Sequence, residues 1–181
     1  MLFRSSRLRA WDRAFLLQCI YSLLRQTPHQ SVRLVAFNLE QQREVFRANP
    51  FDSAAFLHLS QVLEDIETAS ISVQALKQRH SSLLLAALAD EELKAAQHSD
   101  AVIFLGPNSR MDVDISAGIF TENRPLNPPF FYFEYFPWPG SDFPDAIERL
   151  TRAADGKTYQ IHSPAELDQA IEKMLAQLKQ E

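Results

Sequence analysis

The chain has 181 residues, of which 46% are hydrophobic, and it carries a formal net charge of −5. This length suits one globular domain over residues 1–181 that buries about 70% of its unfolded surface. No apolar stretch reaches the ~20 residues that a transmembrane helix needs, so we expect no membrane span. The single cysteine, Cys19, excludes an internal disulfide and any metal site built from several cysteines.

The charge is unevenly distributed along the chain. Residues 1–47 hold eight arginines and three acidic residues, a balance of +5, so residues 48–181 carry the remaining −10. We interpret the basic end as a solvated helix face rather than a phosphate-binding surface, and we expect no nucleic-acid partner. Residues 1–6 lack the apolar segment of a signal peptide. The location is therefore cytoplasmic by default, or extracytoplasmic if a leader has been removed.

The first third of the chain predicts two helices and a pair of strands. Apolar residues within 10–26 repeat at helical spacing, and Cys19 is expected to be a small core residue there. Residues 32–39 are nearly all apolar and predict a buried strand, with residues 44–47 pairing back on it as an edge strand. Asp52 is a suitable N-cap for a second helix. The apolar face of that helix comprises Phe56, Leu59, Leu63 and Ile66.

The middle of the chain contains one strongly apolar strand signal. Residues 70–76 predict a short strand or an extended connection, and residues 81–97 predict a capped helix. The apolar run 101–105, which stops on the breakers at 106–107, predicts a strand buried on both faces. Residues 106–128 are irregular in pattern and predict a loop with at most one short helix.

The last third predicts two more strands and two more helices. Residues 130–136 are aromatic on both faces of a predicted strand, which favours core packing over stacking on bases or sugars. A helix over 144–153, a stop at Gly156 and a strand over 157–162 follow. Residues 163–166, Ser-Pro-Ala-Glu, form a capping box with proline at the first helical position of the terminal helix.

This alternation of helices and strands predicts the fold class. We expect a three-layer α-β-α, Rossmann-like open sheet, mostly parallel with one antiparallel edge strand. Such sheets bind ligands at the carboxyl ends of their strands. The strand at 101–105 is followed by Gly, Pro, Asn and Ser, and therefore offers no carboxylate, cysteine or histidine at that point.

The order of elements resembles a von Willebrand factor A-type domain, most closely a divergent bacterial branch of the family. Residues 32–38 resemble the family's second strand. Residues 83–105 resemble the helix and central strand that flank its metal site, and residues 156–175 resemble its last strand and helix. The resemblance covers most of residues 10–178. It implies a Rossmann-like fold whose usual function depends on a metal ion-dependent adhesion site.

The ligands of that adhesion site are not preserved. The family uses an Asp-x-Ser-x-Ser stretch, a Thr and a second Asp, oxygen ligands that suit Mg²⁺. Here Arg4 stands in place of the first carboxylate, beside Ser5 and Ser6, and Ser81 or Ser82 stands in place of the Thr. Gly106-Pro107 stands in place of the second Asp. We therefore expect no bound metal and no cofactor.

The first strand of the family is also missing from residues 1–9. Only Leu2 and Phe3 precede the region where the first metal-binding loop belongs. A sheet that lacks a central strand exposes unpaired backbone groups. We therefore expect that copies of the chain could associate as a homo-oligomer by strand exchange.

Other groupings of chemistry-bearing residues are weaker. Asp112 and Asp114 alternate as in an acidic metal loop, but they lack the glycine and terminal glutamate of a calcium-binding hand, which favours a solvated loop. None of the five histidines has the i, i+4 partner of a helical zinc site. A glycine-rich phosphate loop cannot be assembled from four glycines, and no Gly-x-Ser-x-Gly elbow is present.

These observations favour a non-catalytic protein–protein interaction domain without a metal site, whose partner the sequence does not identify. Its contact edge would include the loop over 108–128, which contains Asn108, Asp112 and Asp114. The other residues of this edge would be Ser5, Ser6, Ser81 and Pro107. The alternative is an enzyme or small-ligand-binding protein of another doubly wound α/β family. It would use Asp112, Asp114 or a histidine in the crevice at the C-terminal ends of the strands.

Overall fold

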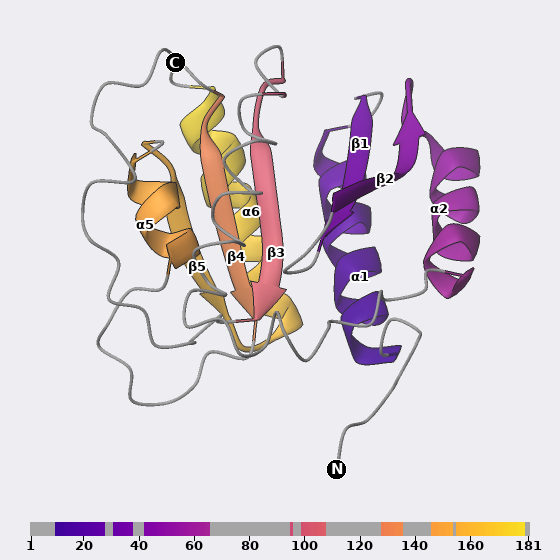
Figure 1. Ribbon diagram of the computed structural model, residues 1–181, viewed down its shortest axis with the longest axis horizontal. Helices are drawn as coiled ribbons and strands as arrows, with labels where there is room; N and C mark the ends of the chain where they lie inside the picture. The colour runs from indigo at the N-terminus through magenta and orange to yellow at the C-terminus, as the bar shows by residue number, and fades with distance from the viewer. Residues whose placement is uncertain are drawn as a thin grey trace. The chain divides into compact units, whose positions relative to one another are not determined.

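The computed structural model (Figure 1) describes residues 10–27, 31–37, 42–65, 95, 99–107, 128–135, 146–153 and 155–179. The chain divides into two compact units, Met1–Ser72 and Val73–Glu181. The predicted strand at 70–76 and nearly all of the predicted loop and of the predicted helix over 81–97 lie outside the described residues. The assignment of residues 1–181 to one domain stays a prediction.

The first unit contains two helices and a two-stranded antiparallel sheet. In chain order the elements are α1 (Ala10–Gln26), β1 (Val32–Phe37), β2 (Gln42–Ala48) and α2 (Ser53–Asp65). The predicted helix over 10–26 and the antiparallel pairing of the two strands are confirmed. The strands pair from Val32 with Ala48 to Phe37 with Gln42, and the register shifts between Leu34 and Val35.

Local hydrogen bonds fix the ends of the two helices. At the end of α1, the backbone N–H and the hydroxyl of Thr27 both donate to the carbonyl of Leu23, at 2.8 and 2.7 Å. At the start of α2, Oδ1 of Asp52 accepts a hydrogen bond from the N–H of Ala55 at 2.8 Å. This contact satisfies one of the free donors of the first turn and confirms Asp52 as the N-cap.

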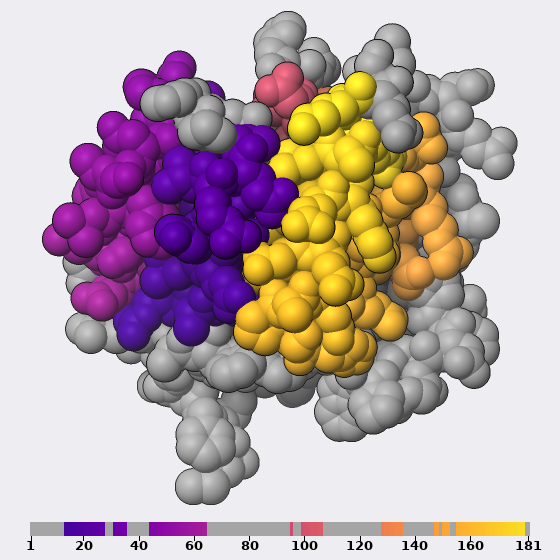
Figure 2. Space-filling view, turned by 180° about the vertical axis from the view of Figure 1, so that it is seen from behind, coloured from indigo at the N-terminus to yellow at the C-terminus, as the bar shows by residue number. Residues whose placement is uncertain are grey.

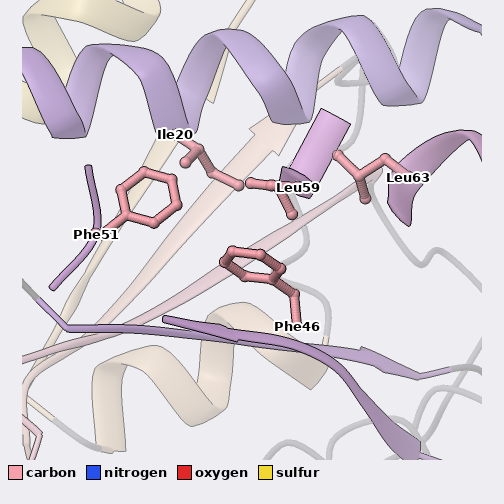
Figure 3. Close-up of a cluster of buried hydrophobic side chains, with 5 residues drawn as sticks. All are labelled: Ile20, Phe46, Phe51, Leu59 and Leu63. Atoms are coloured by element: carbon pink, nitrogen blue, oxygen red, sulfur yellow. The ribbon is translucent and has the colours of Figure 1, made fainter. Parts of the chain in front are cut away.

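A cluster of five buried side chains forms the core of the first unit (Figure 3). Ile20 comes from α1, Phe46 from β2 and Leu59 and Leu63 from α2, while Phe51 lies between β2 and α2. The rings of Phe46 and Phe51 meet edge to face at 6.0 Å, an arrangement that aromatic pairs favour.

The prediction of a buried strand at 32–39 is wrong for the described part of β1. Val32, Leu34 and Val35 are only half-buried, and Arg33 is exposed. The reason is that β1 pairs only with β2 among the described residues, so both strands of this sheet are edge strands. An edge strand is shielded less than a strand between two neighbours.

The second unit contains a three-stranded parallel sheet (Figure 1). Its elements are β3 (Val102–Pro107), β4 (Phe130–Tyr135), α5 (Ala146–Ala153), β5 (Lys157–Ile161) and α6 (Pro164–Leu178), and the strand order is β3-β4-β5. Parallel neighbours require crossover connections, as the predicted alternation of helices and strands implies. None of the helices that the structure describes is long and apolar enough to cross a membrane.

The middle strand, β4, forms the core of the second unit. Its residues Phe130 to Phe133 are at most 1% exposed, which confirms the predicted core role for this part of the aromatic run. Helix α5 packs against β4 and β5, and α6 packs against β5. In Figure 2, which is turned by 180° from Figure 1, α6 lies in front, so it covers the far side of the sheet in Figure 1. The inner side of α6 carries Leu167, Ala170, Ile171 and Met174.

The predicted burial and end of the strand at 101–105 need correction. Residues 101–105 are only partly buried, because β3 lies at the side of the three-stranded sheet and β4 takes the position between two neighbours. The strand also continues through Gly106 and Pro107, where the sequence pattern predicts that it stops. Pro107 is tolerated because the N–H of Val102 points to β4, and every second residue then points the other way.

The predicted cap of the terminal helix is confirmed, with one difference. Ser163 is the N-cap of α6, and its Oγ accepts a hydrogen bond from the N–H of Glu166 at 3.3 Å. The Glu166 carboxylate accepts in turn from the N–H of His162 at 2.8 Å, one residue earlier than in the usual capping box. Pro164 occupies the first helical position.

Candidate functional site

One residue of the predicted contact edge lies within the described part of the chain. Pro107 is the last residue of β3 and is paired with Tyr135 of β4. The other predicted edge residues lie outside the described residues: Ser5, Ser6, Ser81, Asn108, Asp112 and Asp114. Their grouping at one edge therefore stays a prediction.

The carboxyl ends of the three parallel strands meet at one edge of the sheet. One row across that edge consists of Gly106 in β3, Glu134 in β4 and Gln160 in β5. The Glu134 side chain is only 2% exposed. The sequence prediction does not single out Glu134, because this residue lies within the aromatic run at 130–136. The available signal was a single carboxylate in an otherwise apolar strand, since buried glutamates are rare unless they are paired.

The surroundings of Glu134 on its face of the sheet are mainly aromatic. Phe104 and Tyr132 pair with each other two residues before Gly106 and Glu134, in the preceding row on the same face of the sheet. Their rings lie 5.2 Å apart. The Phe104 ring reaches over Gly106, because a Cβ atom at that glycine would lie 2.7 Å from Cε1 of Phe104. Thr158 completes the preceding row, and its hydroxyl is buried without a hydrogen-bond partner among the described residues.

A carboxylate in this setting is suited to accepting hydrogen bonds from a donor or a cation. Burial of a charged group is unfavourable unless it is paired, so a carboxylate at this position depends on the polar groups around it. The adhesion site of the resembled family supplies two carboxylates and several hydroxyls to Mg²⁺, a larger set of oxygen ligands than Glu134 alone. The described residues contain no group of three or more His, Cys, Asp or Glu that could hold a metal ion. Gly106 and Pro107, the last described residues of β3, have no side-chain oxygen that could ligate the adhesion-site metal.

The environment of Cys19 does not suit a catalytic nucleophile. Cys19 is fully buried in α1, which confirms it as a small core residue, and burial raises the pKa of its thiol. A thiol held in its protonated form is a poor nucleophile. His58 is exposed on α2 with its ring 5.7 Å from Phe46, and His162 is exposed just before α6.

The sheet of the first unit carries an exposed charge cluster. Oε2 of Glu44 accepts from Nε of Arg33 at 2.8 Å and from Nη2 of Arg47 at 2.7 Å, and its Oε1 accepts from Nε of Arg47 at 2.9 Å. Hydrogen bonds from Arg47 and then from Arg33 lower the pKa of Glu44 to about 2. Two of the arginines of the basic segment thus share one carboxylate on a solvated strand surface.

Comparison with known proteins adds no assignment. No protein-family model matches the chain, and no curated protein matches it.

Proposed function

We propose that this chain is a von Willebrand factor A-like domain that acts by contact with another protein, without catalysis and without a bound metal ion. The proposal includes a three-layer α-β-α arrangement in which the β3-β4-β5 sheet is the parallel part. The parallel order of these strands supports it, together with the succession β4, α5, β5, α6.

The observation that carries the proposal is the end of β3. In the resembled family the central strand ends on a metal-binding Asp, whereas β3 ends on Gly106 and Pro107, which have no side-chain oxygen. The neighbouring carboxylate, Glu134, lies one row before the ends of the strands and is only 2% exposed. A sheet edge of this kind favours recognition by shape and apolar contact over recognition through a bridging cation.

A thermal-shift titration tests the loss of metal binding. The melting temperature should not change when Mg²⁺ or Mn²⁺ is added to the EDTA-treated chain up to 10 mM, apart from the small effect that Na⁺ gives at equal ionic strength. A ligand that binds the native state stabilises it by RT ln(1 + [L]/Kd), so the melting temperature keeps rising with the logarithm of ligand concentration above Kd. A concentration-dependent rise specific to the divalent ions would contradict the proposal.

A second candidate function is binding of a small cationic ligand at the carboxyl edge of the sheet. Glu134 favours it, because a buried carboxylate near the ends of parallel strands lies where α/β folds bind ligands. Thermal shift with arginine, agmatine and putrescine tests this function. A concentration-dependent rise that Glu134→Gln abolishes and Glu172→Gln, on the exposed side of α6, retains would support it. Equal responses of the two variants would contradict it.

A further inference from the structure

The turn from α5 to β5 contains a chemically reactive pair of residues (Figure 1). Asp155 is followed by Gly156, and this is the single Asp-Gly step in the sequence. At such a step the backbone nitrogen of the glycine attacks the side-chain carboxyl group of the aspartate. Glycine permits this attack because it has no Cβ atom to crowd the nitrogen. Asp155 is also exposed, so its carboxyl group is in contact with solvent.

The reaction at this step needs only water. A bond forms between the nitrogen of Gly156 and Cγ of Asp155, and one water leaves, made from the amide hydrogen and the hydroxyl of the carboxyl group. The product is a five-membered cyclic imide, which a second water reopens. Cleavage between the nitrogen and Cγ restores aspartate. Cleavage between the nitrogen and the backbone carbonyl carbon gives isoaspartate, in which the main chain runs through Cβ and Cγ.

The folded turn opposes the first of these steps. The N–H of Gly156 donates to the carbonyl of Thr151 at 2.9 Å. The N–H of Asp155 donates to the carbonyl of Arg152 at 3.2 Å, and φ of Asp155 is 56°, the left-handed geometry of such a helix end. Ring closure turns the Gly156 nitrogen toward Cγ of Asp155, and this rotation breaks the hydrogen bond to Thr151. The nitrogen is therefore available for attack when the end of α5 opens.

The isoaspartate product does not fit the folded turn. Its linkage adds one atom to the main chain between residues 155 and 156. Gly156 already lies against β4, because a Cβ atom on it would be 2.5 Å from the carbonyl carbon of Phe130. The longer connection therefore pushes Gly156 into β4 or pulls the end of α5 away from its hydrogen bonds. The modified chain cannot restore both the turn and the start of β5.

We propose that Asp155 is a site of spontaneous aspartate isomerisation whose rate is set by opening of the turn between α5 and β5. The closed turn protects the Asp-Gly step, and each opening makes it reactive. Because the product does not regain the native turn, the modified form accumulates with time and is less stable. This proposal does not depend on what the domain contacts.

The rates of isoaspartate formation in the folded chain and in a free peptide test the proposal. A synthetic peptide of residues 150–160 gives the rate without the turn, and the full chain is incubated beside it at pH 7 and 37 °C. Trypsin releases residues 153–157, and chromatography with mass spectrometry separates the two isomers. The full chain should react at least about tenfold more slowly than the peptide. Equal rates would overturn the proposal.

Hydrogen exchange of the Gly156 amide measures the opening of the turn independently. Both exchange and ring closure require the hydrogen bond to Thr151 to break. The protection factor of this amide should therefore match, within about threefold, the factor by which the full chain reacts more slowly than the peptide. A larger disagreement between the two factors would overturn the proposal.

A matched pair of variants tests whether the opening occurs at the end of α5. Arg152 in α5 and Lys173 in α6 are both exposed basic residues. Arg152→Gly removes the 2.7 Å ion pair with Glu148 and weakens the last turn of α5, so the rate should rise about three- to fivefold. Lys173→Gly lowers helix propensity equally in α6 and should change the rate by less than about twofold.

Circular dichroism establishes that each variant is folded. Equal acceleration by the two variants, or no acceleration by Arg152→Gly, would overturn the proposal. If Arg152→Gly does not fold, the agreement between amide protection and reaction rate in the unmodified chain decides alone.

Discussion

Gly156 and the carbonyl group of Phe130 approach so closely that no side chain fits between them. A Cβ atom at Gly156 would overlap the carbonyl oxygen of Phe130 and would lie 2.5 Å from its carbonyl carbon. Both obstructing atoms belong to the backbone of β4, so rotation of a side chain cannot relieve the overlap. The glycine at the start of β5 is therefore required by the spacing of two strands.

Replacement of this glycine should destabilise the second unit. Gly156→Ala forces β4 and the segment before β5 apart at the position where β4 is fully buried, and we expect a loss of about 3 kcal/mol in the free energy of unfolding. Urea denaturation followed by circular dichroism measures the change. A loss below about 1 kcal/mol would show that the backbone yields more easily than its packing suggests.

The preceding residue, Asp155, is the one that uses left-handed backbone geometry. Its φ is 56°, and the hydrogen bonds from Asp155 to Arg152 and from Gly156 to Thr151 form a Schellman motif at the end of α5. Asp155→Ala should cost about 1 kcal/mol, while Asp155→Gly should cost less, because glycine adopts this conformation freely. The same denaturation assay ranks the two variants, and the reverse order would contradict this account of the turn.

The Arg33–Glu44–Arg47 cluster should make the stability of the first unit depend on acidity. Arg33 and Arg47 are direct cross-strand partners in the sheet, so their positive charges repel each other. The Glu44 carboxylate pairs with both and offsets this repulsion. Glu44→Gln should lower the melting temperature at pH 7. The depressed pKa, about 2 instead of 4.5, means that the stabilisation is complete above about pH 4.5 and is lost as the pH falls through about 2.

Melting curves between pH 7 and pH 2 measure this effect. The difference between the unmodified chain and Glu44→Gln should shrink over that acidic interval and should also shrink in 1 M NaCl, because the cluster is exposed and salt screens it. A difference that persists unchanged at pH 2 would mean that the amide disrupts packing rather than charge pairing.

Two leucines of α2 provide a test of the first core. Leu59 is 0% exposed within the cluster of Figure 3, whereas Leu57, two residues away on the same helix, is 62% exposed. Leu59→Ala should cost about 2–5 kcal/mol through the cavity it leaves, and Leu57→Ala should change the stability by less than about 0.5 kcal/mol. Thermal and urea unfolding of the pair measures both. Similar costs for the two variants would contradict the assignment of the core.

The elements that were predictable from sequence have strong local signals. The caps at Asp52 and Ser163 depend on hydrogen bonds within one helical turn, so residue type and spacing are sufficient to locate them. Four consecutive aromatic residues at 130–133 likewise indicate a buried strand, and these residues are buried. Such features require no knowledge of distant parts of the chain.

The features that sequence reasoning missed depend on neighbouring strands. The burial of β3 is set by its position at the side of the sheet, which the apolar run itself does not specify. Pro107 stays in β3 because its missing N–H falls on the side away from β4, a matter of register. Glu134 is buried because it lies between two strands, and its place in the carboxyl-edge row follows from pairing with Gly106 and Gln160.

The central claim is that the carboxyl edge of the parallel sheet contains no site for a divalent cation, and equilibrium binding of Mn²⁺ tests it most directly. Electron paramagnetic resonance measures the free ion in the presence of the full chain at about 100 μM. We predict the same free Mn²⁺ signal with and without the chain across the titration. Saturable loss of one equivalent of signal, reversed by excess Mg²⁺, would contradict the account.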